Sequence, residues 1–278
     1  MWYFVITLFV LLVVAIVYMA FDALFGKKGY GQQRIGELVV VAHRGGAGMA
    51  PENSLTCIRK GLESGADMIE IDIHLTKDGE IVVCHDKEID RTTNGKGRIA
   101  DMTLEELREF RIVDKDGNAT DDVLPTLGEV LEVVDGRARL LVEIKRGSDA
   151  EQIAKAFINE VALYQAASWV VAQSFDDAIL EHLHRLGHPF PIEKLLICKI
   201  PLLPIAFDGK FVGYSYSKYD YINSFNFYYG LLPVALVEDI HSHGKKVKVW
   251  TLDAPDSAPQ LPVDGVITDR PDLWMGNR

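Results

Sequence analysis

The sequence predicts an α/β protein built as a (β/α)₈ TIM-type barrel over residues 37–278, preceded by one N-terminal transmembrane helix. Strand-like apolar runs recur along the chain, and several are separated by helix-length segments, which is the pattern of a parallel α/β sheet. Polar residues cluster where these runs end, and a barrel builds its sites at the carboxyl ends of its strands. An open doubly wound sheet is the alternative. Polar strand ends spread over at least six strands favour the closed ring.

The N-terminus begins with a long apolar run. Trp2 to Phe21 contains about 20 residues without a basic or acidic side chain, enough to span a bilayer as a helix. A cleaved signal peptide is the rival interpretation, but it would need a basic start, a shorter apolar core and a small-residue cleavage site. We therefore predict a membrane anchor over residues 1–25 and a linker over 26–36.

The orientation of this predicted single-pass anchor depends on few charges. Lys27, Lys28 and Arg34 follow the apolar run, and no basic or acidic side chain precedes it. The positive-inside rule then places the catalytic domain on the cytoplasmic side of the membrane. A periplasmic or other extracytoplasmic location stays open as the alternative.

Composition excludes one class of partner. The formal net charge of −11 argues against nucleic acid, which would require a basic surface. The three cysteines, Cys57, Cys84 and Cys198, are an odd number without metal-type spacing. Each lies in an apolar run, so we expect reduced thiols in the core.

The first predicted strand, Glu37 to Ala42, is apolar and rich in Val. It ends at His43-Arg44, and a glycine-containing loop follows. Asn53 or Ser54 can cap a helix from Leu55 to about residue 64, which Gly65 would end.

The second predicted strand, Met68 to Leu75, alternates between apolar and polar residues. Glu70 and Asp72 lie on its polar face. Asp78-Gly79 is a strong signal for a two-residue hairpin loop, which leads into a returning strand. That loop would set Asp72 directly opposite His85, with both side chains on one face.

Two carboxylates and an imidazole on one sheet face indicate a cation site with an acid or base beside it. Like charges on one face repel each other unless a positive group lies between them. The alternative is a solvated face that carries ordinary surface charges, which would suffice for either carboxylate alone.

Setting aside the returning hairpin strand, eight strands are predicted to start near residues 37, 67, 139, 168, 194, 211, 246 and 264. Helices are expected at Thr103 to Phe110, Ala150 to Tyr164, Asp176 to Leu186 and Leu232 to His243. Residues 201–231 and 252–263 fit the barrel pattern poorly and predict no helix.

Eleven short motifs keep one order along the chain, and together they resemble the glycerophosphodiester phosphodiesterase family. They are His43-Arg44-Gly45, Pro51-Glu52-Asn53-Ser54, Glu70-Ile71-Asp72, Thr76-Lys77-Asp78-Gly79, His85-Asp86, Arg91-Thr92-Thr93, Pro125-Thr126-Leu127, Glu143-Ile144-Lys145, Gln173-Ser174-Phe175, Val249-Trp250-Thr251 and Ile267-Thr268-Asp269. The resemblance implies a barrel, a divalent cation, and hydrolysis of glycerophosphodiesters to glycerol 3-phosphate and an alcohol.

The resemblance also implies roles for the residues at the strand ends. Glu70, Asp72 and Glu143 would hold the cation, and three hard oxygen ligands suit Ca²⁺ or Mg²⁺. For Glu143, a salt bridge with Lys145 is the alternative. His43 and His85 would be the acid–base pair, because the pKa of imidazole suits proton transfer near neutral pH.

Four further residues are expected at the substrate. Arg44 and Lys145 would neutralise the phosphate, the first as a bidentate fork and the second as a point charge. Gln173 and Trp250 would bind the rest of the small-molecule phosphodiester. For Trp250, packing without substrate contact is the alternative.

Two other functions stay open at this point. A lysophospholipase D would share the chemistry but take acylated substrates, and the aromatic residues within 201–231 could hold the acyl chain. A non-catalytic barrel that binds glycerophosphodiesters is the other possibility.

Overall fold

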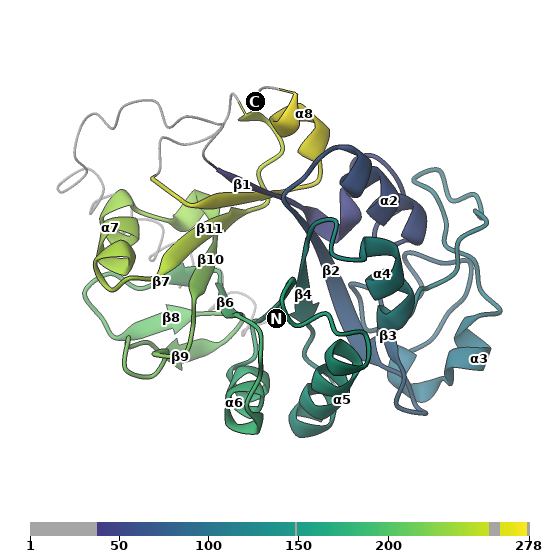
Figure 1. The fold of residues 1–278 in the computed structure, drawn as a ribbon, viewed down its shortest axis with the longest axis horizontal. Helices are drawn as coiled ribbons and strands as arrows, with labels where there is room; N and C mark the ends of the chain where they lie inside the picture. The colour runs from purple at the N-terminus through teal and green to yellow at the C-terminus, as the bar shows by residue number, and fades with distance from the viewer. Residues whose placement is uncertain (1–37, 148, 256–261, 277–278) are drawn as a thin grey trace, which may run out of the picture.

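A closed ring of eight parallel strands forms the centre of the molecule in the computed structural model, which describes residues 38–147, 149–255 and 262–276 (Figure 1). In order around the ring these strands are β1 (Val39–Ala42), β2 (Met68–Leu75), β4 (Arg139–Ile144), β5 (Val170–Ser174), β6 (Ile192–Leu196), β10 (Ser224–Tyr228), β11 (Lys246–Trp250) and β12 (Gly265–Thr268). Parallel pairing of β1 with both β12 and β2 closes the ring. The predicted TIM-type barrel is confirmed.

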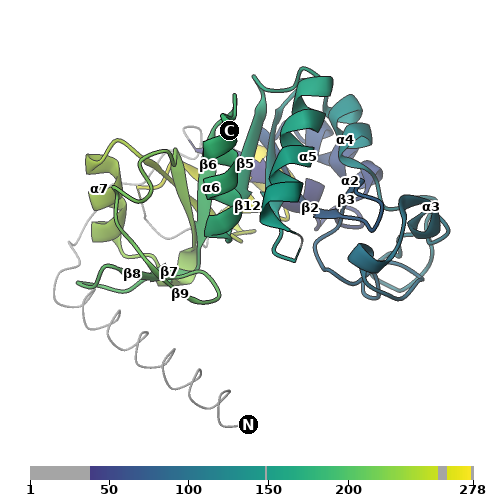
Figure 2. The ribbon, with the colours of Figure 1, turned by 90° about the horizontal axis from the view of Figure 1, so that it is seen from below.

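Helices surround this ring (Figures 1 and 2). They are α2 (Leu55–Glu63), α4 (Leu127–Val134), α5 (Ala150–Leu163), α6 (Asp177–Leu186), α7 (Val234–Ser242) and the short α8 (Pro271–Met275). Ser54 caps α2 by accepting a hydrogen bond from the backbone N–H of Cys57, as its position in the sequence predicts.

The predicted strand near residue 211 is not part of the barrel, and this prediction was wrong. Phe211–Gly213 is β9, which pairs with β8 (Ile205–Phe207) and β7 (Cys198–Lys199) in a separate antiparallel sheet. The sixth barrel strand is β10, inside the segment that fitted the barrel pattern poorly. Its aromatic side chains Phe225 and Phe227 are fully buried in the main core.

Two helices were missed because they are short. The helix α4 starts at a capping box, in which Thr126 and Glu129 exchange hydrogen bonds with each other's backbone N–H. The last helix, α8, has Pro271 at its start. In contrast, the predicted helix at 103–110 is only one turn long, α3 (Leu104–Leu107).

Besides a small cluster formed by β1, β2, β4, β5 and β12, which includes Val41, Met68 and Ile267, two further hydrophobic cores are found among the described residues. The larger fills the space between the barrel and its helices. The smaller belongs to an excursion over residues 84–124, between β3 (Ile81–Val83) and α4, that projects from the barrel with α3 at its far side (Figure 2). Its buried members include Cys84, Ile89, Leu107 and Ile112. The excursion therefore has packing of its own, separate from the barrel.

The predicted anchor at 1–25 and linker at 26–36 lie outside the described residues. Among the residues that are described, none of the helices is both long and apolar enough to cross a membrane. The predicted thiols Cys57, Cys84 and Cys198 are buried and unpaired.

Candidate active site

Three buried carboxylates meet at the carboxyl ends of β2 and β4. Glu70 and Asp72 alternate along β2, and the barrel register places Asp72 beside Glu143 of β4. One oxygen of each of the three lies within 4.8 Å of the others. Such a set of hard oxygen donors fits Ca²⁺ or Mg²⁺.

Burial makes two of these carboxylates, Glu70 and Glu143, costly to ionise. It raises the pKa of Glu70 to about 8, with the neighbouring charge of Asp72 adding to the effect. Burial also raises the pKa of Glu143, although Lys145 opposes the shift. A bound divalent cation would offset this cost, because it favours the charged carboxylates.

Lys145 lies between two of the carboxylates. Its ammonium Nζ is 2.9 Å from Asp72 Oδ1 and 2.8 Å from Glu143 Oε1. The salt bridge that was the alternative for Glu143 is therefore present, within the same cluster. Burial alone would lower the pKa of Lys145, but the two carboxylates outweigh it and the pKa is raised.

The hairpin between β2 and β3 differs by one residue from its predicted register. Leu75 pairs with Ile81, and the backbone N–H of Cys84 donates to the carbonyl oxygen of Asp72 at 2.9 Å. Cys84, and not His85, is thus opposite Asp72. The predicted two-residue loop was wrong, because residues 77–79 form a three-residue loop closed by a left-handed Gly79.

A side-chain hydrogen bond fixes this longer loop. The hydroxyl of Thr76 accepts from the backbone N–H of Glu80 at 2.9 Å, and the backbone N–H of Thr76 donates to the carbonyl oxygen of Glu80. Thr76 and Glu80 therefore close the hairpin. The Thr directly before the loop is the sequence feature that goes with this geometry.

His85 reaches the site although the predicted pairing is absent. The strand β3 ends at Val83, so His85 lies beyond the ladder. It lines a cavity of about 300 Å³ together with Glu143 and Lys145. Its Nδ1 is 2.6 Å from Asp86 Oδ1. The side chain is 33% exposed, which leaves it accessible to a ligand in the cavity.

The two residues that contact or precede His85, Cys84 and His74, are both buried. Cys84 packs in the small core of the excursion, where burial raises the pKa of its thiol to about 11. His74 is buried, and its Nε2 is 3.2 Å from the carbonyl oxygen of His85. Its position on the polar face of β2 therefore turns it into the cavity wall.

His43 lies on the tight turn η2 (His43–Gly45) at the end of β1. Its Nδ1 is 2.6 Å from Asp269 Oδ1, at the end of β12. Burial lowers the pKa of His43, but the hydrogen bond to Asp269 and the charge of Glu70 outweigh burial, and the pKa is raised. The acidic partners of both histidines were missed as site residues, although each belongs to a quoted motif.

Arg44 joins the same turn to the carboxylates. Its backbone N–H donates to Glu70 Oε2 at 2.8 Å, and its Nε is 3.6 Å from Asp72 Oδ2. The amide of Asn53 donates to Asp72 Oδ2 at 2.9 Å. Asn53 was considered only as a possible helix cap, and its contact with Asp72 could not be seen without the fold.

Gln173 and Trp250 lie farther into the barrel wall. The amide of Gln173 donates to Glu70 Oε1 at 3.3 Å and accepts from Asn226 at 2.8 Å. Trp250 packs edge-on against Phe175, with ring centres 5.8 Å apart, and its indole N–H donates to the backbone carbonyl of Asn226. Their contact with substrate stays a prediction.

The barrel thus brings together the carboxylates, both histidines and two cationic side chains at one end, as in a TIM-barrel enzyme. The model of the glycerophosphoryl diester phosphodiesterase family matches residues 43–273. The chain belongs to this family and is a phosphoric diester hydrolase. The alternative of a non-catalytic barrel is therefore set aside.

Individual relatives agree with this assignment. The chain is 33% identical over 243 residues to a glycerophosphodiester phosphodiesterase of Caldanaerobacter subterraneus, covering 85% of this chain and 96% of that one. A glycerophosphodiester phosphodiesterase of Parabacteroides distasonis superposes with a TM-score of 0.69 at 25% identity, over 86% of this chain and 96% of that one. A phosphodiesterase of Oleispira antarctica, in complex with the product sn-glycerol-3-phosphate, superposes with a TM-score of 0.73 at 24% identity, over 86% and 95%.

Proposed function

We propose that this chain is a divalent-metal-dependent phosphodiesterase that hydrolyses glycerophosphodiesters to glycerol 3-phosphate and an alcohol, in phospholipid and glycerol metabolism. The observation that carries the proposal is the buried cluster of Glu70, Asp72 and Glu143 beside two histidines with carboxylate partners. The names of its relatives support the substrate class, as does the product bound by the enzyme of Oleispira antarctica.

In this proposal, Glu70, Asp72 and Glu143 hold Ca²⁺ or Mg²⁺. The bound cation would supply positive charge that polarises the phosphate and stabilises its developing negative charge. Arg44 and Lys145 add fixed positive charge beside the carboxylates, so that the phosphate binds and is oriented there. Gln173 and Trp250 would contact the remainder of the substrate.

His43 and His85 move the protons. His43 takes the proton of the attacking oxygen, and Asp269 stabilises the imidazolium that results. As the bond between phosphorus and the leaving oxygen breaks, His85 gives its proton to that oxygen. His85 faces the cavity of about 300 Å³, which offers room for the leaving alcohol.

The test is turnover of glycerophosphocholine by the purified full chain, with glycerol 3-phosphate measured as the product. We expect activity that chelation removes and that a series of Ca²⁺, Mg²⁺ and other divalent ions restores. Turnover that continues unchanged in excess chelator would contradict the metal-dependent mechanism.

A lysophospholipase D is the second candidate, and one surface favours it. Leu202, Leu203 and Phe211 are 88%, 50% and 57% exposed around the β7–β9 sheet. Ile197 and Asp208, at the base of that sheet, line the same cavity as His85. An acyl chain could therefore lie on this apolar surface while its phosphodiester reaches the carboxylates.

Comparison of lysophosphatidylcholine with glycerophosphocholine separates the two candidates. Under the leading proposal, glycerophosphocholine has the higher kcat/KM. Activity on the acylated substrate alone would favour the lysophospholipase D, and Leu202→Ser would then raise KM for that substrate selectively.

The proposed location is a single-pass anchor over residues 1–25 with the catalytic domain on the cytoplasmic side. The uncharged run from Trp2 to Phe21 and the basic residues after it support this topology. Protease digestion of intact cells tests it: a domain cleaved from outside would support the extracytoplasmic alternative instead.

A further inference from the structure

The sheet holds the backbone of His85 but not its imidazole. The ladder with β2 ends at Val83, the backbone N–H of Cys84 makes the last backbone hydrogen bond, to Asp72, and His74 of β2 contacts only the carbonyl oxygen of His85. His85 follows that point, on the excursion that has its own small core. Some other set of contacts must therefore fix its imidazole at the carboxylate cluster.

The first such contact is Asp86. One of its oxygens binds His85 Nδ1 at 2.6 Å, and the other accepts from Arg91 Nε at 2.7 Å. The hydrogen bond from Arg91 lowers the pKa of Asp86 to about 2, despite partial burial, and His85 contributes to the same shift. Asp86 is therefore an anion at neutral pH, oriented by Arg91 on one side and free to orient His85 on the other.

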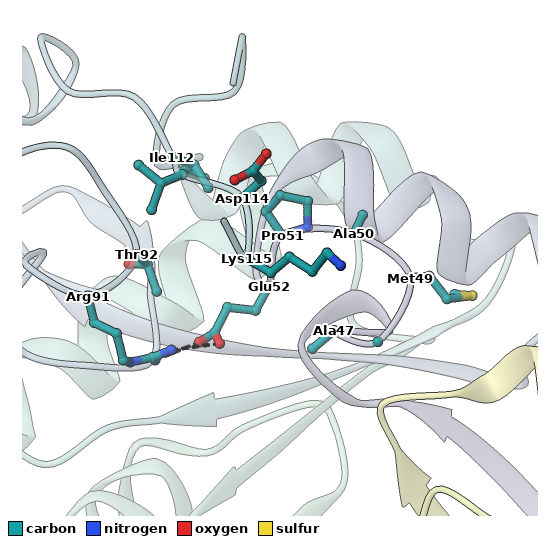
Figure 3. A pocket seen from close by; sticks show the side chains of 12 residues that line it. Ala47, Met49, Ala50, Pro51, Glu52, Arg91, Thr92, Ile112, Asp114 and Lys115 are labelled. Carbon is teal, nitrogen blue, oxygen red and sulfur yellow. Dashed lines mark hydrogen bonds and ion pairs between the residues drawn. The ribbon is translucent and has the colours of Figure 1, made fainter. Parts of the chain in front are cut away.

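The second contact joins Arg91 to the barrel. Its Nη1 and Nη2 donate to the two oxygens of Glu52 at 2.8 Å each, as the dashed lines in Figure 3 show. Glu52 belongs to the loop between β1 and α2, and its Oε1 also accepts from Arg44 Nη1 at 2.9 Å. Arg44 in turn contacts Asp72 and Glu70.

Five contacts thus lead from Asp72 to His85, through Arg44, Glu52, Arg91 and Asp86, whose charges alternate in sign. We propose that Glu52, Arg91 and Asp86 are positioning residues, which hold the imidazole of His85 at the reacting phosphate by tying the excursion to the Arg44 turn. The proposal depends on the acid–base function proposed for His85. It assigns a catalytic consequence to two residues, Glu52 and Arg91, that contact neither His85 nor the three carboxylates of the cluster in this structure.

Packing does not provide an alternative explanation for the position of Arg91. Its side chain is 48% exposed, and a cavity of about 560 Å³ lies beside its pair with Glu52, between Pro51 and the segment that carries Ile112 (Figure 3). An isolated exposed ion pair contributes little to stability. Arg91, however, uses its whole guanidinium fork on two carboxylates, which fixes geometry in a way that a lysine cannot.

The experiment measures kcat and KM for glycerophosphocholine in the full chain with its metal, for Arg91→Ala and Glu52→Gln. Displacement of a catalytic group by about 1 Å costs on the order of 10²-fold, so we expect kcat to fall by about that factor in Arg91→Ala. KM should change little, because the groups that neutralise the phosphate remain. Arg91→Lys should recover only part of the loss.

Repeating the Arg91 substitution in the His85→Ala variant separates a positioning role from a general disturbance of the fold. In His85→Ala, there is no imidazole left to position, so adding Arg91→Ala should cost almost nothing further. Arg108→Ala is the matched control, because it breaks an ion pair of 2.6 Å between the same excursion and Glu129 of α4, without contact to His85. Its kcat should match that of the unaltered chain.

The outcomes are distinct. An equal loss from Arg91→Ala in both backgrounds would overturn the positioning role, and so would an unchanged kcat in Arg91→Ala while His85→Ala is impaired. An unchanged kcat in His85→Ala would overturn the proposed function of that histidine and the inference with it. Where Arg91→Ala does not fold, Arg91→Lys and Glu52→Gln carry the same comparison.

Discussion

Glu70 is a buried carboxylate of the site that two other site residues contact. It accepts a hydrogen bond from the backbone of Arg44 and another from the amide of Gln173, while it is almost fully buried. Its pKa is nevertheless raised to about 8, first by burial and then by the charge of Asp72. Without a cation, ionised Glu70 therefore destabilises the fold, and this should be measurable in the free energy of unfolding.

The pH dependence of unfolding gives one prediction for the metal-free protein. An unfolded Glu loses its proton near pH 4.3, about the usual value, whereas Glu70 in the folded chain keeps it to about pH 8. Between these values the folded state binds more protons, so the free energy of unfolding falls as pH rises. Glu70→Gln should reduce that fall.

Urea unfolding at pH 5 and pH 8 in chelator measures the effect. Other groups with raised pKa values, such as His43 and Glu143, add a slope of the same sign in both proteins. The decisive quantity is thus the difference between Glu70→Gln and the unaltered chain. An identical pH slope in both would mean that Glu70 is ionised in the metal-free fold.

Leaving-group chemistry tests the two histidines. A substrate with a nitrophenolate leaving group needs little protonation, so it should rescue His85→Ala more than His43→Ala. With an ordinary alcohol, His85→Ala should lower kcat by about 10²- to 10⁴-fold, as expected for lost general acid catalysis. Metal binding should persist in both variants, measured by calorimetry. Equal rescue of the two would show that the acid and base assignments are mistaken.

At the scale of single elements, two turns with left-handed glycines have different consequences. Gly79 closes the β2–β3 loop with φ of 87°, and no atom would lie near an added Cβ. Gly45 ends the turn that carries Arg44, and an added Cβ would lie 2.9 Å from the backbone nitrogen of Ile58. A side chain at Gly79 therefore causes only backbone strain, whereas a side chain at Gly45 also forces the turn to move.

We therefore predict that Gly79→Ala destabilises the fold by about 1–2 kcal/mol, the cost of a left-handed residue, with kcat unchanged. Gly45→Ala should destabilise more and also lower kcat, because Arg44 moves with the turn. Thermal unfolding and turnover on the same samples provide the comparison. A normal kcat in Gly45→Ala would show that the turn does not govern the site.

The elements that the sequence could predict are those with regular periodicity. Strands β1, β2 and β11 are continuous runs of Val and Ile or alternate cleanly, and α5 has a long amphipathic pattern. The strand β10 was missed because SFNFY alternates aromatic and polar side chains without aliphatic residues. Its buried Asn226 bonds to Gln173 and Glu193, which only the closed barrel brings near.

The hairpin shows that the predicted site residues come together through a geometry that differs from the predicted one. Asp-Gly favours a two-residue loop, but the Thr76 hydroxyl stabilises a loop one residue longer. His85 lies beside Glu143 and Lys145 all the same, and contacts between residues far apart in sequence, such as Arg91 with Glu52, connect its partner Asp86 to the barrel. Those contacts leave no periodic signal in the sequence.

At the scale of the whole molecule, residues 38–276 contain the barrel, its helices and every described site contact. The apolar run before them supplies none of the motif residues. We predict that removal of residues 1–30 gives a soluble domain with kcat close to that of the full chain in detergent. Solubility and turnover of the two forms check this, and an unfolded product would place the domain boundary earlier in the chain.

The separate core of the excursion has a consequence for heat inactivation. Of the two proposed proton-transfer groups, His43 lies on the barrel and His85 on the excursion, which packs around its own small core. On warming, the excursion should unfold or detach from the barrel at a lower temperature than the barrel itself unfolds. The enzyme would then lose activity at a temperature where the carboxylate cluster can still bind its cation, and cooling would restore the activity. Amide exchange over residues 84–124 would reveal the same event as a local loss of protection.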